Sequence, residues 1–318
     1  MRMLRFVSSI ALIYVGVGVN GASASPTLTV ASLQERIVAA RHVEHVSTLT
    51  PNPRRLTKDN AWKYSGLKYA VAEKCFRMSD TSTVTHPQPC LGGDLRSSTT
   101  IVIFGDSAVG NWTPALRAAG ELHHWRVASL QYEGCMLAFL TTESSTCQAF
   151  HRRLPATIAA LHPTLVIGVG GYAASGSAFD ATFARGVRDA VNALRQQSPS
   201  ARYVLWGTSP QLPLSAPVCV TARRTSVNTC GVDFRRGDTS PQSFGATVSR
   251  DHRAATLAKV RFVAVDAFFC AAAWCPAVVD HTLVYVDERH VSERYSLSLE
   301  PLVSSTVSSV LNSTDSGH

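Results

Sequence analysis

The chain has 318 residues, of which 45% are hydrophobic and 16% are charged. Such a composition supports a sizeable buried core and excludes a disordered chain. The formal net charge of +8 comes largely from scattered arginines that form no run or stripe, so we do not expect nucleic-acid binding. A mild positive excess remains compatible with weak attraction to an anionic polymer of the cell envelope.

The first 24 residues are expected to form a secretory signal peptide. Arg2 and Arg5 precede an apolar stretch at 6–19, and Ala22-Ser23-Ala24 is a small-residue cleavage site. The alternative is an uncleaved N-terminal anchor, because an apolar stretch of this length is short for a membrane span but does not exclude one. Both interpretations predict a secreted or extracytoplasmic protein associated with the cell envelope.

The eight cysteines are even in number and follow an export signal, which favours disulfides over metal ligands or catalytic thiols. No C-x-x-C pair is present, so zinc is disfavoured. Eight cysteines allow about a hundred connectivities, and a preference for local closure selects nearest neighbours. The predicted pairs are Cys75–Cys90, Cys135–Cys147, Cys219–Cys230 and Cys270–Cys275.

An N-terminal region at 25–98 is expected to pack on the main domain as a helix and a stapled loop. Apolar residues recur at helical spacing over 33–46, and two prolines then break the pattern. The polar stretch 58–98 holds two cysteines and a Gly-Gly pair, so we expect loops there rather than regular structure. At the other end of the chain, residues 313–318 are expected to form a flexible tail.

Short apolar runs alternate with helix-length amphipathic segments over 99–312. The candidate strands are 99–104, 125–130, 164–169, 202–206, 261–265 and 282–286. The candidate helices are 113–122, 147–161, 179–197, 246–259 and 292–311. This alternation implies βαβ crossovers, and therefore an α/β domain with a mainly parallel sheet covered on both faces. In such sheets the active site lies at the carboxyl ends of the strands.

The segment 209–243 fits no helix or strand pattern and holds four prolines and two cysteines. We expect it to form a stapled insertion over the site. Its pairs Arg223-Arg224 and Arg235-Arg236 are candidates for contact with an anionic acceptor, and a solvated face is the alternative.

Gly105-Asp106-Ser107 follows the apolar run 99–104 directly and precedes an expected helix. A serine at the carboxyl end of a buried parallel strand lies exposed in the crevice, where backbone N–H groups can stabilise a developing oxyanion. Gly105 gives the chain room to turn. Taken alone, these residues are ordinary turn types, and a helix cap at Asp106 or Ser107 is the alternative.

Asp287 and His290 form a D-x-x-H group between the run 282–286 and the last expected helix. Within one turn, the carboxylate can accept a hydrogen bond from one imidazole nitrogen and leave the other to take the proton of Ser107. Alone, such a group is more often a helix cap with a surface histidine. Combined with Ser107, it predicts a catalytic triad.

The two motifs, in this order, resemble the SGNH hydrolase family, which has an early G-D-S block and a late D-x-x-H block. The chain is most similar to SGNH domains fused to acyltransferase-3 membrane domains in bacterial surface-glycan O-acyltransferases. Further residues that carry the resemblance are Trp112, Pro114-Ala115-Leu116, Gly134-Cys135, the Cys75 to Cys90 staple, Tyr285-Val286 and Val291-Ser292. The resemblance spans about 51–311. It implies a three-layer α/β/α fold with Ser107 as nucleophile, His290 as general base and Asp287 as its orienting partner.

The chain departs from the family at one donor of the oxyanion hole. Many members carry an Asn in a central G-x-N-D block, whereas the matching strand here ends Gly168-Val169-Gly170-Gly171-Tyr172. We therefore expect the backbone N–H groups of Ser107, Gly134 and Gly171 to form the hole. Turnover is expected to be slow or selective, because one such donor is worth about 10²–10³ in rate.

Three further residues close to the nucleophile in sequence are candidates for the pocket: Asp106, Asn111 and Trp112. For Trp112, which falls near the start of an expected helix, a place in the core is the alternative.

These features predict an exported serine esterase or O-acyltransferase that forms an acyl-Ser107 intermediate, which water or a sugar hydroxyl resolves. This chemistry requires no metal and no organic cofactor. The resemblance and the export signal imply acylated glycans or glycolipids of the cell envelope as substrates. Since the chain carries no membrane acyltransferase in cis, we expect either a separate one in trans or plain ester hydrolysis.

The alternative function is a non-catalytic envelope binding or scaffold protein that retains the fold, which the missing Asn suggests. The presence of Ser107, Asp287 and His290 at the expected places argues against such a loss of chemistry.

Overall fold

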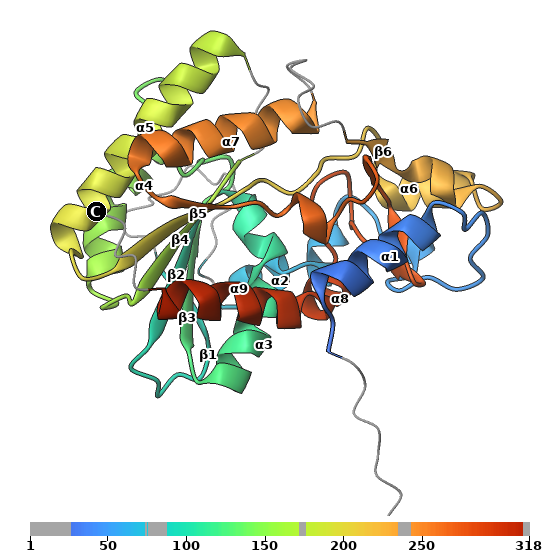
Figure 1. The fold of residues 1–318 in the computed structure, drawn as a ribbon, viewed down its shortest axis with the longest axis horizontal. Coiled ribbons are helices and arrows are strands. Elements are labelled where there is room, and N and C mark those ends of the chain that lie inside the picture. Colours follow the sequence, from blue (N-terminus) through green and yellow to red (C-terminus); the bar gives the residue numbers. More distant parts are fainter. Residues whose placement is uncertain (1–26, 74, 76–87, 172–175, 235–242, 314–318) are drawn as a thin grey trace, which may run out of the picture.

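The computed structural model describes residues 27–73, 75, 88–171, 176–234 and 243–313. It has a mixed α/β fold in three layers, with a six-stranded sheet between two groups of helices (Figure 1). The predicted signal peptide at 1–24 and nearly all of the predicted tail at 313–318 lie outside the described residues.

The central sheet is mainly parallel, as the sequence predicts. Its strand order is β1-β3-β2-β4-β5-β7, in which β1 at one edge runs antiparallel to β3. The strands are Cys90–Gly93 (β1), Thr100–Gly105 (β2), Arg126–Gln131 (β3), Leu165–Val169 (β4), Arg202–Trp206 (β5) and Arg261–Val263 (β7). Every residue of β2 is buried, because this strand lies inside the sheet and has helices on both faces.

Helices cover both faces of this sheet. One face packs against α3 and α9, and the other packs against α4, α5 and α7. These helices are Thr113–His123 (α3), Ser145–Ala159 (α4), Ser177–Gln197 (α5), Phe244–Ala258 (α7) and Glu300–Asn312 (α9). Successive residues of β2 point to opposite faces, so Ile101 and Ile103 contribute to one core and Val102 and Phe104 to the other.

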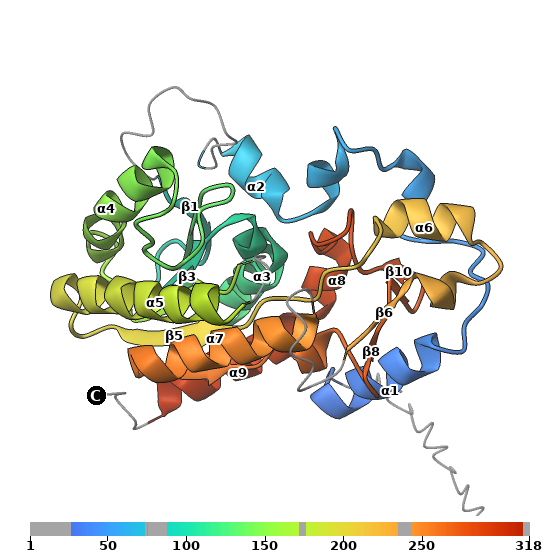
Figure 2. The ribbon, with the colours of Figure 1, turned by 90° about the horizontal axis from the view of Figure 1, so that it is seen from above.

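A smaller group of elements lies on the side toward which β5 and β7 run (Figures 1 and 2). It comprises α1 (Val30–Ala40), the 3₁₀ helix η1 (Pro53–Arg55), α6 (Ala216–Ala222), the antiparallel pair β6 (Val232–Asp233) and β8 (Trp274–Cys275), and the antiparallel pair β9 (Val278–Val279) and β10 (Thr282–Leu283). The shorter helices not yet given are η2 (Ala61–Tyr64), α2 (Leu67–Ala72), η3 (Ser107–Asn111), η4 (Val227–Cys230), η5 (Asp266–Phe268) and α8 (Glu293–Ser298).

The N-terminal helix α1 shows why these elements form where they do. Thr29 caps it, because its hydroxyl accepts the N–H of Ser32 and the hydroxyl of Ser32 accepts the N–H of Thr29. Leu33 and Ile37 lie one turn apart on one side of the helix and are completely buried in the core. The helix ends at Ala40, six residues earlier than predicted.

All four disulfides join the cysteines that the sequence pairs: Cys75–Cys90, Cys135–Cys147, Cys219–Cys230 and Cys270–Cys275. The bonded cysteines are 5 to 15 residues apart. Closing loops of this size constrains the unfolded chain by roughly 2–4 kcal/mol per bond. The bond Cys135–Cys147 joins the turn after β3 to α4, and Cys219–Cys230 joins α6 to η4.

The prediction that 58–98 lacks regular structure is wrong. The segment contains η2 and α2, and its strand β1 extends the central sheet by pairing antiparallel with β3. A four-residue strand with two glycines carries no local strand signal, so its conformation depends on the neighbouring strand rather than on propensity. This strand precedes the domain boundary expected at residue 99.

The prediction of a central strand at 282–286 is also wrong. Only Thr282 and Leu283 form a strand, and they pair with β9 outside the central sheet. The backbone of the following residues bonds locally, since Val284 donates to Ala277 and Val286 donates to His290. A short apolar run signals burial, and here the burial comes from packing among loops and helices rather than from a sheet.

Two helix predictions need correction. The segment 209–243, expected to lack regular structure, contains α6, which has Pro217 in its first turn, and the strand β6. The last predicted helix, 292–311, is two helices that meet at Leu299, with Pro301 in the first turn of the second. Arg235 and Arg236 lie outside the described residues.

Within the described ranges, no helix combines the length and apolarity that a bilayer crossing requires.

Candidate active site

Ser107 lies where β2 turns into the helix η3. Gly105, the last residue of the strand, has a φ of +151°, and a Cβ there would lie 3.2 Å from the carbonyl oxygen of Val169. A larger residue is therefore disfavoured at this turn. Asp106 then caps η3, because its Oδ1 accepts the N–H of Ala108 at 2.8 Å. The turn leaves the side chain of Ser107 partly exposed at the carboxyl end of the sheet.

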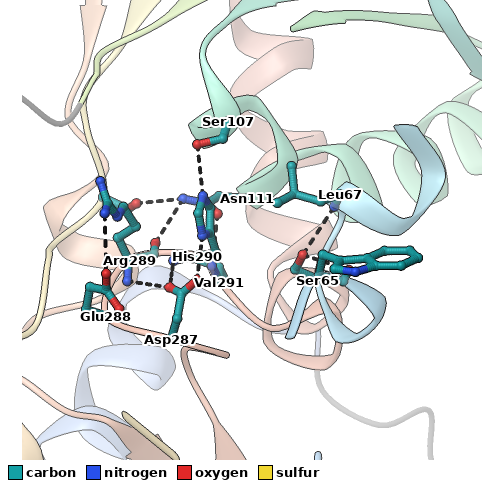
Figure 3. A network of polar contacts seen from close by, with 11 residues as sticks. Ser65, Leu67, Ser107, Asn111, Asp287, Glu288, Arg289, His290 and Val291 are labelled. Atoms are coloured by element: carbon teal, nitrogen blue, oxygen red, sulfur yellow. Dashed lines mark hydrogen bonds and ion pairs between the residues drawn. The ribbon is translucent and has the colours of Figure 1, made fainter. Parts of the chain in front are cut away.

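Asp287 and His290 reach Ser107 from the other end of the chain (Figure 3). The Nε2 atom of His290 lies 2.9 Å from Ser107 Oγ, and its Nδ1 atom lies 2.6 Å from Asp287 Oδ2. With Nδ1 donating to the carboxylate, Nε2 is the acceptor for the serine hydroxyl. The structure thus brings together all three residues of the predicted triad.

The carboxylate of Asp287 also organises its own turn. Its Oδ1 accepts the N–H groups of Arg289 at 2.8 Å and His290 at 2.7 Å. Burial alone would raise the pKa of Asp287, but the hydrogen bond from His290, the charge of His290 and these two N–H groups outweigh burial and lower it. Asp287 is consequently ionised at neutral pH, and its carboxylate can form an ion pair with His290 when the imidazole is protonated.

Asn111 connects η3, which carries Ser107, to the loop that carries His290. Its Oδ1 accepts the N–H of Val291 at 2.9 Å, and its Nδ2 donates to the carbonyl oxygen of Arg289 at 3.4 Å and to Ser209 Oγ at 2.9 Å. The side chain therefore bonds the backbone on both sides of His290 (Figure 3). Asn111 is 1% exposed, so it lies beneath the site and does not line an open pocket.

A second set of bonds holds the same loop from the α6 side. The N–H of Leu212 donates to the carbonyl oxygen of Glu288 at 2.8 Å, and the N–H of Ala216 donates to that of Asp287 at 3.0 Å. The segment predicted as an insertion over the site is thus bonded directly to the D-x-x-H turn.

A buried ion pair fixes the ends of the neighbouring strands. Arg250 and Asp251 on α7 are fully buried and lie 2.7 Å apart. Asp251 accepts the N–H and hydroxyl of Thr208 at 2.9 and 2.8 Å, and Arg250 donates to the carbonyl oxygen of Gly171 at 2.8 Å. Removing one partner of such a pair typically costs about 3–5 kcal/mol.

The residues predicted for the oxyanion hole differ in their surroundings. Gly171 lies beside the turn that carries Ser107, since a Cβ there would lie 3.1 Å from Asp106 Oδ2 and 2.8 Å from Met136 Cγ. Gly134 lies in an exposed turn after β3, with a φ of +73°. Tyr172, which follows in the G-G-Y stretch, lies outside the described residues.

Trp112 lies in the core, the alternative that the sequence leaves open. It is completely buried, and its ring makes edge contacts with Trp206, Phe269 and Phe268 at centroid distances of 5.0, 5.7 and 6.3 Å. This aromatic cluster supports the start of α3 and hence the position of η3.

Asp106, predicted for the pocket, is a buried carboxyl beside the triad. Burial raises its pKa to about 6, although the N–H of Ala108 and the positive charges of His290, Arg289 and Arg250 act in the opposite direction. Asp106 therefore keeps its proton to a higher pH than an ordinary aspartate does.

Sequence reasoning missed the positioning role of Asn111 and the pair Arg250–Asp251. Asn111 lies four residues after the nucleophile, but no local pattern indicates which backbone groups it bonds. Adjacent Arg and Asp residues in a helix suggest a solvated face, so nothing in the sequence signals that this pair is buried.

A mainly parallel α/β sheet with hydrogen-bonded Ser, His and Asp side chains at its carboxyl edge has the architecture of an α/β serine hydrolase. A family model described as "SGNH domain (fused to AT3 domains)" matches residues 74–305, which is most of the chain. The chain belongs to this SGNH family.

Two solved structures are similar to the chain, and the first of them shares its fold. The periplasmic domain of a lipopolysaccharide acetyltransferase from Salmonella ser. Paratyphi A is 12% identical, with a TM-score of 0.59 over 80% of this chain and 99% of that one. A carbohydrate acetylesterase from Sinorhizobium meliloti is 14% identical, with a TM-score of 0.42 over 67% of this chain and 99% of that one. A search of the curated proteins finds no match to the sequence.

We predict that Asp106→Asn stabilises the protein at neutral pH. A folded pKa of about 6 against an ordinary value of 3.8 means that the folded state binds more protons between these values. The free energy of unfolding therefore falls as pH rises through this window and Asp106 ionises. At higher pH the protein stays destabilised by the full amount. The amide should raise that free energy by about 2–3 kcal/mol at pH 7.5 and by much less near pH 4.

Urea unfolding at the two pH values measures this difference. Asp94→Asn is the matched control, because the hydrogen bond from His124 lowers the pKa of that partly exposed carboxyl and no gain at high pH is expected. An Asp106→Asn variant that is destabilised more at pH 7.5 than at pH 4 would contradict the assignment.

Proposed function

We propose that the protein is an exported serine esterase or O-acyltransferase that forms an acyl-Ser107 intermediate. The observation that carries the proposal is the continuous hydrogen-bonded chain from Ser107 through His290 to Asp287. Membership of the SGNH family supports an ester-acting enzyme.

In the first half-reaction Ser107 Oγ attacks the ester carbonyl, and His290 Nε2 takes the hydroxyl proton. The imidazolium is stabilised by Asp287, which is ionised at neutral pH. His290 then returns the proton to the departing alcohol, which leaves an acyl-serine. In the second half-reaction water or a sugar hydroxyl gives its proton to His290 and attacks the acyl carbon, and Ser107 recovers its proton as the bond breaks.

The oxyanion hole is proposed to consist of the backbone N–H groups of Ser107, Gly134 and Gly171. Gly171 next to Asp106 supports this assignment, because it puts the end of β4 beside the nucleophile turn. The ion pair Arg250–Asp251 would keep this backbone rigid, which is what stabilisation of a developing charge requires.

Acylated glycans or glycolipids of the cell envelope are the proposed substrates. The similar structures come from a lipopolysaccharide acetyltransferase and a carbohydrate acetylesterase, and the first of them is a periplasmic domain. An extracytoplasmic location agrees with the signal peptide or N-terminal anchor proposed at 1–24 and with four disulfides.

A separate membrane acyltransferase is the proposed partner in trans. The family consists of SGNH domains fused to AT3 domains, so an acyl group delivered across the membrane is a natural donor to Ser107. Without that donor the same site would hydrolyse esters.

Labelling of purified protein with a fluorophosphonate probe tests the nucleophile. The wild type should be labelled, and Ser107→Ala and His290→Ala should lose the label because one lacks the attacking oxygen and the other lacks the base. His281→Ala is the matched control and should label like the wild type. A folded wild-type protein with neither labelling nor ester cleavage would favour a non-catalytic envelope binding protein instead.

We predict that Asn111→Ala slows the labelling of Ser107 and lowers kcat for a small aryl ester by about 10–100-fold. The substitution removes both bonds that flank His290, and a shift of about 1 Å in a catalytic group can cost about 10² in rate. Since Asn111 is buried beneath the site, KM should change less than about twofold.

Ser209→Ala is the control for this variant, because it removes one partner of Asn111 and keeps the two bonds beside His290. Thermal unfolding of both variants establishes that they are folded. Equal loss of kcat in the two variants, or a change confined to KM, argues against a positioning role for Asn111.

A further inference from the structure

A pocket of about 360 Å³ lies between η1 and α6, away from Ser107. Its walls come from the segment before η1, from η1 itself, and from α6 with the residues that follow it. Figures 1 and 2 show α6 at the end of the molecule opposite α4 and α5. We call it the arginine pocket, after Arg54 and Arg224, which both line it.

The residues that line the arginine pocket carry positive charge and no negative charge. No carboxylate lines it, and among the residues that the structure describes neither guanidinium has a carboxylate within ion-pair distance. Arg224 donates from Nε to the carbonyl oxygen of Thr221 at 3.3 Å, which holds its guanidinium near the end of α6. Two exposed guanidiniums that converge on one pocket attract a carboxylate or phosphate, with which they can form paired hydrogen bonds.

The other residues of the arginine pocket suit a sugar rather than a simple anion. Ser47, Thr48 and Thr221 supply hydroxyl groups, and Val220 and Val227 supply apolar surface. A pocket that combines apolar walls with a few polar groups orients an organic ligand. An inorganic anion would leave the apolar wall unused.

A second cavity of about 150 Å³ adjoins the first and shares Val46 and Val227 with it. Trp274, Asn228 and His281 also line it, which adds an aromatic ring, an amide and an imidazole. The carboxylate of Asp280 lines it too, and its charge is balanced by an ion pair with Arg36. The ring nitrogen Nδ1 of His281 lies 3.3 Å from the carbonyl oxygen of Thr48, so the walls of the two cavities are bonded together. Two adjoining cavities fit more than one sugar unit.

The arginine pocket lies within reach of the triad. The N–H of Ala216 bonds the carbonyl oxygen of Asp287, and α6 runs from there to Ala222, about 9 Å at 1.5 Å per residue, with Arg224 two residues further on. His281 precedes Asp287 by six residues, a separation of at most about 20 Å even for an extended chain. A short oligosaccharide can therefore bridge the two places.

We propose that these two adjoining cavities form a remote subsite for an anionic oligosaccharide, whose carboxylates or phosphates pair with Arg54 and Arg224. The proposal rests on the proposed function, because it names the chemistry of the acceptor that approaches the acyl-serine. Binding away from the reacting atoms holds the acceptor at the site while one of its hydroxyl groups reaches Ser107.

Isothermal titration calorimetry with two probes tests the subsite: a hexamer of galacturonate, with a carboxylate on each unit, and neutral maltohexaose. The wild type should bind the charged hexamer at least tenfold more tightly than the neutral one, and added NaCl should weaken that binding. The double variant Arg54→Ala/Arg224→Ala should raise the Kd for the charged hexamer at least tenfold. Neither side chain packs in the core, so the variant should unfold at the wild-type temperature.

Arg152→Ala/Arg185→Ala is the matched control, since it removes the same charge from exposed positions on α4 and α5. It should keep the wild-type Kd. Equal weakening in both double variants, or no binding of the charged hexamer by the wild type, overturns the proposal. Binding to phosphatidylglycerol vesicles that depends on Arg54 and Arg224, without binding of the hexamer, would also overturn it and assign the surface to a lipid.

Fluorophosphonate labelling separates this proposal from the proposed function. The Arg54→Ala/Arg224→Ala variant should label at Ser107 at the wild-type rate, because neither arginine belongs to the triad. If the wild-type protein binds the charged hexamer but is not labelled, the subsite is supported and the proposed acyl-serine chemistry is rejected. If the wild-type protein is labelled but does not bind the charged hexamer, the acyl-serine chemistry is supported and the subsite is rejected.

Discussion

The contact between Ser107 and His290 joins residues that are 183 positions apart in the chain. The side chains of Asp287 and Asn111 hold His290 in place for this contact. Asp287 accepts two N–H groups of its own turn with one oxygen and the imidazole with the other, and Asn111 bonds the backbone on both sides of His290. The position of the imidazole is therefore tied to η3, the helix that carries Ser107, so the two halves of the site are coupled.

The same edge of the sheet is braced by a charge pair that no solvent reaches. Arg250 and Asp251 join α7 to the backbone after β4 and β5, at Gly171 and Thr208. The pair bonds the backbone at both places, which holds the two strand ends together. Removing either partner would leave an uncompensated buried charge. Rigid donors and a rigid base are what acyl transfer requires, since their reorganisation would add to the barrier.

The sequence predicts those parts of the molecule that local chemistry determines. An apolar, β-branched run before Gly105-Asp106-Ser107 indicates a buried parallel strand, and β2 is completely buried. Nearest-neighbour closure predicts all four disulfides, because short loops favour local pairing. The D-x-x-H spacing likewise places the carboxylate and the imidazole within one turn.

What the sequence does not predict depends on contacts between distant segments. The run 282–286 is as apolar as a central strand, yet loops and helices bury it instead of a sheet. Strand β1 forms because β3 offers a free edge, and its own residues show no strand pattern. The side-chain partners of Asn111 come from two segments far from it in the chain, so no spacing rule can identify them.

Trapping an acyl-Ser107 intermediate on the wild-type protein is the most direct test of covalent catalysis by Ser107. The protein is mixed with p-nitrophenyl acetate, quenched with acid before one turnover is complete, digested and examined by mass spectrometry. One acetyl group is expected on the peptide that contains Ser107, and none on that peptide in Ser107→Ala. Consumption of the ester with no acetylated peptide, or with the acetyl group on another residue, would contradict it.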